Sequence, residues 1–278
     1  MTFGVEELTV RYADVTALHS VTVSAREGQV SAVVGGDGAG KSTLLRALVG
    51  RLAPDAGRVS APAARRIGYQ PARGGSWPDL TVGENMAFVA GMYGLDVTTA
   101  ARRTDVLLDR AGLTGARNRL SRRLSGGMRT KLGFCLAMVH EPELLVLDEP
   151  STGVDPVSRV ELWRLLSATA ASGTAVLMAT TYMEEGERSS HVTVLEKGRV
   201  LLEGPPGEVV ASCPGVVYAT TAPRRPELSW RHADGFREWW PAPPPDGDHP
   251  EADRPVHVDL EDVTIVAALR GEMAKASR

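Results

Sequence analysis

One short stretch of the chain has the residue types and the spacing of a phosphate-binding loop. It reads Gly35-Gly36-Asp37-Gly38-Ala39-Gly40-Lys41-Ser42-Thr43. This fits the pattern G-x-x-x-x-G-K-[ST], in which glycines let the backbone curl around a polyphosphate because a Cβ atom would block the turns. In such a loop Lys41 reaches the β- and γ-phosphates and Ser42 offers its hydroxyl to Mg²⁺. The stretch therefore predicts a triphosphate site.

A pair of carboxylates supplies a second chemical feature. Residues 144–147 are an unbroken apolar run, and Asp148 and Glu149 follow it directly. In a parallel sheet such a strand is buried on both faces, so its carboxyl end displays charges where ligands bind. Asp148 can hold Mg²⁺ through water, and Glu149 can take a proton from an attacking water. The pair can also be a helix cap after a core strand, but the phosphate loop favours metal and base.

A third motif, Leu124-Ser125-Gly126-Gly127-Met128, opens a predicted helix that runs to about His140, where Glu141-Pro142 stops it. A serine hydroxyl and bare backbone N–H groups at a helix start can bind an anion. Ser-Gly is also an ordinary helix cap, so this motif gains weight only together with the other two.

Strands and helices around these motifs are expected to position them. Residues 29–34, before the phosphate loop, are apolar and β-branched, and residues 44–49 after it have helical spacing. That arrangement places a helix N-terminus on the phosphates. A helix from about Pro156 to Ala171, a strand over 174–181 and a hairpin over 192–202 that turns at Lys197-Gly198 follow. Strands that alternate with helices indicate an α/β fold with a mostly parallel sheet.

The amino end and the middle of the chain have a different character. Residues 3–10 and 21–25 are strand-like, so the amino end is predicted to form a sheet. Tyr12 follows the first of these runs; from spacing alone it packs on an edge strand rather than on an adenine. From Val82 to about Arg123 the pattern is helical, which predicts an inserted helical subdomain.

Composition limits the classes of function. The chain has 278 residues, 43% of them hydrophobic, and a net charge of -3, which gives no electrostatic sign of a nucleic-acid partner. No apolar run approaches the length that spans a bilayer, and the first residues do not resemble a signal peptide. Cys135 and Cys213 have no metal-type spacing, which fits a reduced, cytosolic setting.

Beyond Pro205 the pattern weakens. We expect residues 206–278 to form a carboxy-terminal appendage with a proline-rich linker at about 241–255. Three tryptophans, Trp230, Trp239 and Trp240, are interpreted as packing anchors. Asp259 is predicted to cap a helix that begins at Leu260.

Together these motifs resemble the nucleotide-binding subunit of ATP-binding cassette (ABC) transporters, over roughly residues 3–205. The resemblance implies a P-loop NTPase with a RecA-like, mostly parallel sheet core, an amino-terminal antiparallel β portion and a helical subdomain at about 83–140. The nucleotide-binding domain would then cover residues 1–205. It also implies that Asp155 belongs to the D-loop and that Tyr12 stacks on adenine, which reverses the preference from spacing.

The resemblance implies partners as well. In that family two nucleotide-binding domains pair head to tail, so that Ser125, Gly126 and Gly127 of one subunit close ATP on the phosphate loop of the other. The second domain can be an identical or a different chain. The run 182–187 and residues 259–263 resemble subunits of drug-type exporters. Such a subunit is cytoplasmic, has no membrane span of its own, and lies on the inner face of the cell membrane against a permease subunit.

Two positions depart from the family pattern. The Q-loop glutamine position holds Ala72, and Gln70 lies two residues earlier, displaced by roughly 6–7 Å in an extended segment. The usual histidine is Thr181, which can donate one hydrogen bond but cannot carry a cation. We therefore predict an ATPase that binds ATP and Mg²⁺ but hydrolyses slowly or with the help of a partner. Glu149, Lys41 and Thr181 are its expected catalytic residues, and Gln70 an expected nucleotide contact.

Other functions stay open from the sequence. A soluble cassette ATPase that acts on ribosomes or another machine is one, because the helical subdomain is rich in arginine: Arg102, Arg103, Arg117, Arg119, Arg122 and Arg123. A P-loop kinase of small molecules is a second, against which the Ser125-Gly126-Gly127 motif argues. A regulatory module that binds nucleotide without hydrolysing it is the third.

Overall fold

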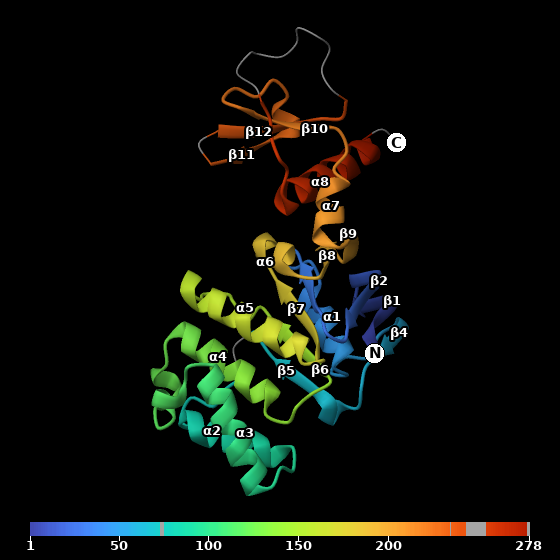
Figure 1. Ribbon diagram of the computed structural model, residues 1–278. Helices are drawn as coiled ribbons and strands as arrows, with labels where there is room; N and C mark the ends of the chain where they lie inside the picture. Colours follow the sequence, from blue (N-terminus) through green and yellow to red (C-terminus); the bar gives the residue numbers. More distant parts are fainter. Residues whose placement is uncertain (73–74, 234, 243–253, 277–278) are drawn as a thin grey trace. The chain divides into compact units, whose positions relative to one another are not determined.

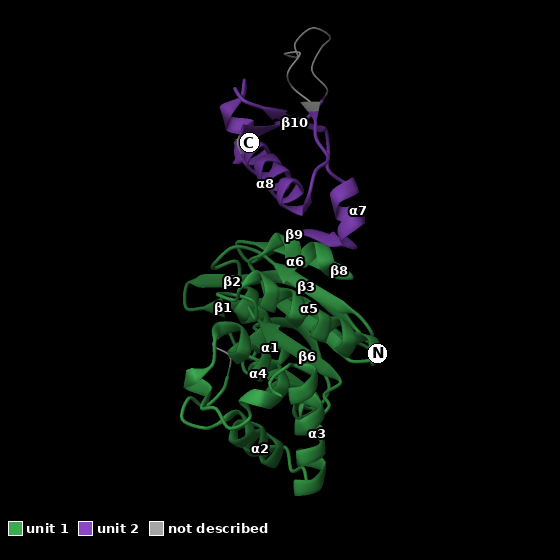
Figure 2. Ribbon diagram, turned by 60° about the vertical axis from the view of Figure 1, so that its left-hand side comes forward, with its two compact units in different colours: residues 1–200 green, residues 201–278 purple. Residues whose placement is uncertain are grey.

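The structure is a computed structural model that describes residues 1–72, 75–233, 235–242 and 254–276. The chain forms two compact units, Met1–Val200 and Leu201–Arg278, shown in different colours in Figure 2. Each unit has an apolar core of its own. Among the helices of these described ranges, none is long and apolar enough to cross a membrane.

An antiparallel sheet forms the amino end, as predicted. Its strands are β1 (Thr2–Tyr12), β2 (Val15–Arg26) and β4 (Ala56–Ser60), in the order β2-β1-β4. The β1–β2 hairpin closes with Tyr12 opposite Val15. In parts of β1 and β2, buried side chains alternate with exposed or half-buried ones. This two-residue alternation is typical of a sheet that has one covered face.

The central sheet is mostly parallel, which confirms the predicted fold class. It consists of β3 (Val30–Val34), β5 (Ile67–Gln70), β6 (Leu144–Asp148), β7 (Ala175–Thr180), β8 (His191–Glu196) and β9 (Arg199–Gly204). The strand order is β5-β6-β7-β3-β8-β9, and the pairs from β5 to β8 are parallel. Lys197 and Gly198, both at positive φ, turn the chain between β8 and β9 as predicted.

The central strands are buried on both faces. Leu145 and Leu147 pack with the helices α4 (Gly126–Met138) and α5 (Pro156–Ala171), whereas Leu144 and Val146 pack with α1 (Lys41–Leu48) and the antiparallel sheet. Successive side chains of a strand point to opposite faces, so one apolar run fills two cores. Figure 1 shows α1 and α5 on either side of β6 and β7. This explains why the strand sequences show no polar alternation.

The helical segment lies between β5 and β6 in the sequence. It contains α2 (Val82–Met92), α3 (Val97–Arg110), the 3₁₀ turns Thr114–Ala116 and Ser121–Arg123, and then α4. Thr81 and Glu84 form a capping box at the start of α2, and Asp96 caps α3. A 3₁₀ turn Ala64–Arg66 precedes β5, and the short helix α6 (Met183–Arg188) follows β7.

The second unit contains a sheet that the sequence did not predict. Its strands β10 (Val216–Thr220), β11 (Ser229–His232), β12 (Gly235–Trp240) and β13 (Arg254–Pro255) pair antiparallel in the order β11-β12-β10-β13. The helices α7 (Pro206–Ala211) and α8 (Leu260–Ala276) and the 3₁₀ turn Pro226–Leu228 complete it. Strand β13 lies within the stretch predicted as a proline-rich linker, of which residues 243–253 lie outside the described residues.

Two predictions for this unit are confirmed. Asp259 accepts a hydrogen bond from the Asp262 N–H, and Asp262 accepts one from the Asp259 N–H, so the two carboxylates cap α8 reciprocally. Trp239 is 2% exposed in the core, and Trp230 packs against the same cluster. The Trp240 ring is covered by the Arg225 guanidinium at 3.5 Å from the ring centroid. The tryptophans are therefore packing anchors.

Candidate functional site

The phosphate loop connects β3 to α1, and Lys41 is the first residue of that helix. The Lys41 side chain is 4% exposed and its Nζ donates to the carbonyl oxygens of Gly35, at 2.8 Å, and Gly36, at 3.1 Å. A cavity of about 240 Å³ lies over the loop. It is lined by Ala17, Asp37, Gly38, Ala39, Gly40, Lys41, Ser42, Thr43 and Glu149. The predicted loop and the predicted base thus share one cavity.

Gly40 shows why this loop requires glycine. Its φ is +107°, and a Cβ atom there would lie 2.6 Å from Leu18 Cδ2 and 2.8 Å from the Ala17 carbonyl oxygen. The side of β2 therefore lies against the loop just before α1 begins. A larger residue would strain the backbone and push β2 away from the cavity.

The acidic end of β6, which β7 separates from β3 in the sheet, reaches the same cavity. Ser42 Oγ donates to Asp148 Oδ1 at 3.0 Å, and Lys41 Nζ lies 3.3 Å from Glu149 Oε1. The carboxyl ends of parallel strands meet at one edge of the sheet, which is why residues more than a hundred positions apart come together. Glu149 has a positive φ of 47°, an uncommon conformation for a residue with a side chain. Such strained residues cluster at functional sites.

Asp148 is well suited to a divalent cation. Its side chain is 3% exposed, and burial, together with the nearby Glu149 charge, raises its pKa above the ordinary value, while the Ser42 hydrogen bond opposes this. A hydroxyl and a carboxylate are the hard oxygen donors that Mg²⁺ takes in sites where phosphates and waters complete the shell. In the described ranges no group of three or more His, Cys, Asp or Glu side chains could hold a metal ion. Ser42 and Asp148 therefore fit a nucleotide-bound Mg²⁺ rather than an all-protein metal site.

The Ser-Gly-Gly motif begins α4 as predicted. Ser125 Oγ accepts a hydrogen bond from the Met128 N–H at 3.2 Å, so its side chain acts as an ordinary cap. A Cβ atom on Gly127 would lie 2.3 Å from Ser158 Oγ, and one on Gly126 would lie 3.1 Å from the Gly153 carbonyl oxygen. The glycines thus let the start of α4 pack closely on the first turn of α5 and on the segment that precedes it.

Asp155 lies in that segment and caps α5. Its Oδ1 accepts from the Ser158 N–H at 3.0 Å, and the hydrogen bonds from Ser158 lower the pKa of the carboxyl. Neither Asp155 nor Ser125 to Gly127 is among the residues that line the cavity over the phosphate loop. Their predicted role, to contact ATP held by another subunit, stays a prediction.

Three further predicted residues lie outside that lining. Tyr12 ends β1 and is 43% exposed, while Thr181 follows β7 and is half-buried. Gln70 is 2% exposed, and its amide nitrogen lies 3.4 Å from the Thr130 carbonyl oxygen on α4. Its Oε1 has no partner among the described residues. The structure therefore points Gln70 toward the helical segment, and its contact with nucleotide stays a prediction.

A buried cluster beside the site was not found from the sequence. Glu185 accepts hydrogen bonds from Ser151 and Thr180, and all three side chains are at most 2% exposed. The sequence shows adjacent glutamates at 184 and 185 and gives no reason to choose between them, because a one-turn helix has too few residues for a clear periodicity.

A larger cavity, of about 670 Å³, lies at the opposite edge of the sheet. It is bordered by Glu143 and Thr174, which precede β6 and β7, and by Arg103, Leu107 and Arg110 of α3. Since Asp148 and Thr180 end these strands, this cavity is separate from the one over the phosphate loop.

Comparisons with known proteins agree with this geometry. The family described as "ABC transporter" matches residues 18–152. The chain is 37% identical over 218 residues to the Nod factor export ATP-binding protein I of Ralstonia nicotianae, covering 74% of this chain and 68% of that protein. It is 36% identical over 222 residues to the probable multidrug ABC transporter ATP-binding protein YbhF of Escherichia coli, covering 76% of this chain and 38% of that protein.

A solved structure has the same fold. It is cbiO1 of Clostridium perfringens, described as part of the ABC transporter complex cbiONQ. The two chains are 29% identical with a TM-score of 0.68, and the match covers 76% of this chain and 90% of that one.

Proposed function

The chain belongs to the ABC transporter family, and on this basis we propose that it is the ATP-hydrolysing subunit of an exporter. The proposal includes ATP and Mg²⁺ as ligands, a second nucleotide-binding domain, and a separate membrane permease against which the subunit lies on the cytoplasmic face. It treats residues 1–205 as the nucleotide-binding domain and 206–278 as an appendage. The observation that carries it is that Lys41, Ser42 and Glu149 line one cavity and that Ser42 is hydrogen-bonded to Asp148.

Each of these side chains has a place in hydrolysis. Lys41, at the start of α1, neutralises phosphate charge together with the N–H groups of the helix N-terminus. Ser42 and Asp148 would hold Mg²⁺, which supplies further charge neutralisation when bound. Glu149 accepts a proton from the attacking water. In the proposal this proton acceptor is kept close to the phosphates by the strained backbone at Glu149.

Slow or partner-dependent turnover is part of the proposal. Thr181 can donate one hydrogen bond to a γ-phosphate but carries no cation, and the Gln70 amide is engaged with α4. The chain would then lend its Ser125-Gly126-Gly127 motif to the site of its partner, whether an identical or a different chain.

An exposed aromatic pair supports a docking surface for the permease. Trp77 and Phe88 are 40% and 46% exposed, and their rings meet edge to face with centroids 4.6 Å apart. Pro78 adjoins them and is exposed. Arg73, which we expected at the same contact, lies outside the described residues. Aromatic residues, Trp and Phe among them, are enriched in protein–protein interfaces relative to the rest of the surface.

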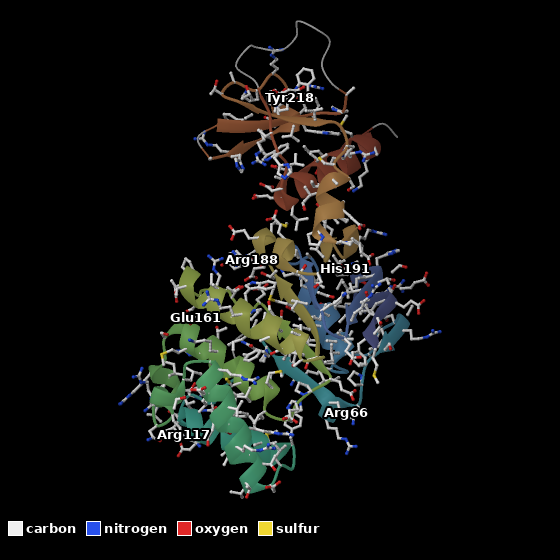
Figure 3. The ribbon with its side chains drawn as sticks, in the orientation of Figure 1. Arg66, Arg117, Glu161, Arg188, His191 and Tyr218 are labelled. Atoms are coloured by element: carbon white, nitrogen blue, oxygen red, sulfur yellow. The ribbon has the colours of Figure 1, made fainter. Side chains whose placement is uncertain are left out.

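The ribosome-directed alternative is weakened by ion pairing. Arg103 pairs with Glu141, Arg117 with Asp105, and Arg122 with Asp79. Figure 3 labels Arg117 at the surface of the helical segment. Half of the six arginines are therefore neutralised locally, which reduces the attraction for nucleic acid.

Fractionation of cells distinguishes a subunit that binds a membrane permease from an ATPase that acts on ribosomes. We expect the chain to sediment with membranes together with an integral membrane protein, and Trp77→Ala with Phe88→Ala to release it into the soluble fraction. Sedimentation with ribosomes that 0.5 M salt abolishes would favour the alternative.

A further inference from the structure

A buried carboxylate connects the segment that follows Glu149 to the segment that contains Thr181. Glu185 is 2% exposed, and its Oε2 accepts from Ser151 Oγ at 2.9 Å and from Thr180 Oγ1 at 2.5 Å. Its Oε1 has no hydrogen-bond partner among the described residues. Glutamate is almost never fully buried unless it is paired, so this side chain calls for an explanation.

The two donors belong to the segments that carry the chemistry. Ser151 lies two residues after the proposed base Glu149, and Thr180 ends β7 immediately before Thr181. Thr180 Oγ1 also accepts from the Tyr182 N–H at 3.1 Å, which fixes the backbone on the far side of Thr181. Figure 1 shows α6, which carries Glu185, next to β7 and α5. Glu185 therefore joins the chain after the base to the chain around Thr181.

Two weaker contacts join the same segments. The guanidinium of Arg159, on α5, lies 4.9 Å from the centroid of the Tyr182 ring. The Glu149 N–H donates to the Ala179 carbonyl oxygen at 2.9 Å. Both Glu185 hydrogen bonds are buried, and the low local dielectric of a protein interior strengthens a hydrogen bond.

An apolar side chain could fill this position without the desolvation penalty of a carboxylate. Buried polar groups that break the local rules of packing are expected at functional sites. Two hydroxyl donors that share one carboxylate oxygen restrict the relative placement of the two segments that carry them. Glu185 thus fixes the distance between the two segments more narrowly than apolar packing would.

We propose that Glu185 is a positioning residue for ATP hydrolysis, which holds Glu149 and Thr181 in register through Ser151 and Thr180. This inference rests on the proposed function. Glu185 itself does not contact nucleotide in this account; it acts only through the two hydroxyls.

Kinetics of matched variants test the proposal. In Glu185→Gln we expect kcat for ATP to fall by about tenfold or more, while KM stays within about twofold, because the geometry for chemistry is lost and the phosphate loop is untouched. Glu184→Gln, the same change on an exposed neighbour of the same helix, should change neither value. A rise in KM with kcat unchanged, or equal effects of both variants, would overturn the proposal.

A second pair of variants avoids the problem of a protein that fails to fold. Thr180→Val keeps the shape of the side chain and removes its hydroxyl, while Thr180→Ser keeps the hydroxyl. We expect the valine variant to lose turnover and the serine variant to retain most of it. If both lose turnover equally, shape rather than the hydrogen bond to Glu185 matters, and the proposal is wrong.

Amide hydrogen exchange separates this proposal from the proposed activity. Glu185→Gln should speed exchange in both 149–155 and 180–186, with Glu184→Gln as the control. A parent protein without turnover would refute the proposed hydrolysis, and the exchange result would still decide the role of Glu185. Faster exchange in 180–186 alone would contradict a link between the two segments.

Discussion

The Lys41 ammonium lies 3.3 Å from the carboxylate of Glu149, across the cavity that the phosphate loop lines. One residue begins α1, which follows β3, and the other follows β6, so their contact depends on two strands that end at the same edge of the parallel sheet. The group expected to hold phosphate and the group expected to accept a proton are thus within reach of one ligand.

Asp148→Asn should stabilise the protein at neutral pH. Burial, the largest cause, raises the pKa of Asp148 in the folded state above its unfolded value. The folded state therefore binds the proton more tightly, and stability falls as the pH rises from the ordinary aspartate value through the raised one. Asparagine removes this penalty, so melting temperatures measured without Mg²⁺ should favour the variant at pH 7–8 and converge with the parent near pH 4.

The same variant should lose the effect of Mg²⁺ on ATP affinity, because the amide carries no charge. A variant that melts lower than the parent at pH 7–8, or that still responds to Mg²⁺, would contradict the assignment of Asp148.

Thr181→His should raise ATP turnover. Imidazole can carry a cation near neutral pH, which a threonine hydroxyl cannot. A positioned histidine is expected to accelerate turnover by about tenfold or more at saturating ATP. Thr181→Ala, which removes the only hydrogen-bond donor of the side chain, serves as the opposite control and should be slower than the parent. A histidine variant no faster than the parent would show that position 181 does not limit hydrolysis.

Gly127→Ala should destabilise the contact between α4 and α5. The new Cβ would lie 2.3 Å from Ser158 Oγ and 2.6 Å from Ser158 Cβ, so one helix must move. Overpacking of this kind costs about 1–3 kcal/mol, which urea denaturation can measure. Gly91→Ala, an exposed position in α2 with nothing within 4 Å of the added atom, is the control and should be neutral or slightly stabilising. If the two variants were equally stable, the contact between α4 and α5 would have more room for an added methyl group than the structure shows.

Much of the fold and of the central site could be predicted from the sequence because the chemistry lies on local motifs. The loop of residues 35–43 and the carboxylates at 148 and 149 follow two buried strands that both pair with β7, and the carboxyl ends of parallel strands lie at one edge of the sheet. Helix ends also depend on residues that are close in sequence. Asp259 was predicted to cap α8, and it does. In these places the neighbours in sequence decide the structure.

Other parts depend on contacts between distant residues. Strand β10 pairs with β13, so that Tyr218 lies opposite Pro255, and no local pattern indicates that register. The Gln70 amide lies against Thr130 of α4, a contact between residues far apart in sequence that no local pattern predicts, while its contact with nucleotide stays a prediction. Packing likewise determines that Glu185, and not Glu184, is the buried glutamate.

Asp262→Ala should unfold the second unit. Asp262 accepts hydrogen bonds from Trp230 Nε1 at 3.2 Å and from the Asp259 N–H, and it forms an ion pair with Arg237, whose side chain is 11% exposed. Removal of a buried partner costs about 3–5 kcal/mol because the remaining charge stays uncompensated. Near-ultraviolet circular dichroism of the tryptophans should report the loss.

The exposed neighbour Glu261→Ala is the matched control and should keep the tryptophan signal. We expect ATP affinity to change by less than about twofold in both variants, since the cavity residues all belong to the first unit. Loss of ATP binding in Asp262→Ala would show that the second unit supports the site.

The most direct test of the account is ATP turnover by the purified chain beside Glu149→Gln, with ATP binding measured on both and Lys41→Ala as the variant that should not bind. We predict slow turnover by the parent, none by Glu149→Gln, and similar ATP affinity for these two proteins. Equal turnover with and without the Glu149 carboxylate would contradict its role as the base. Failure of the parent to bind ATP would contradict the account as a whole.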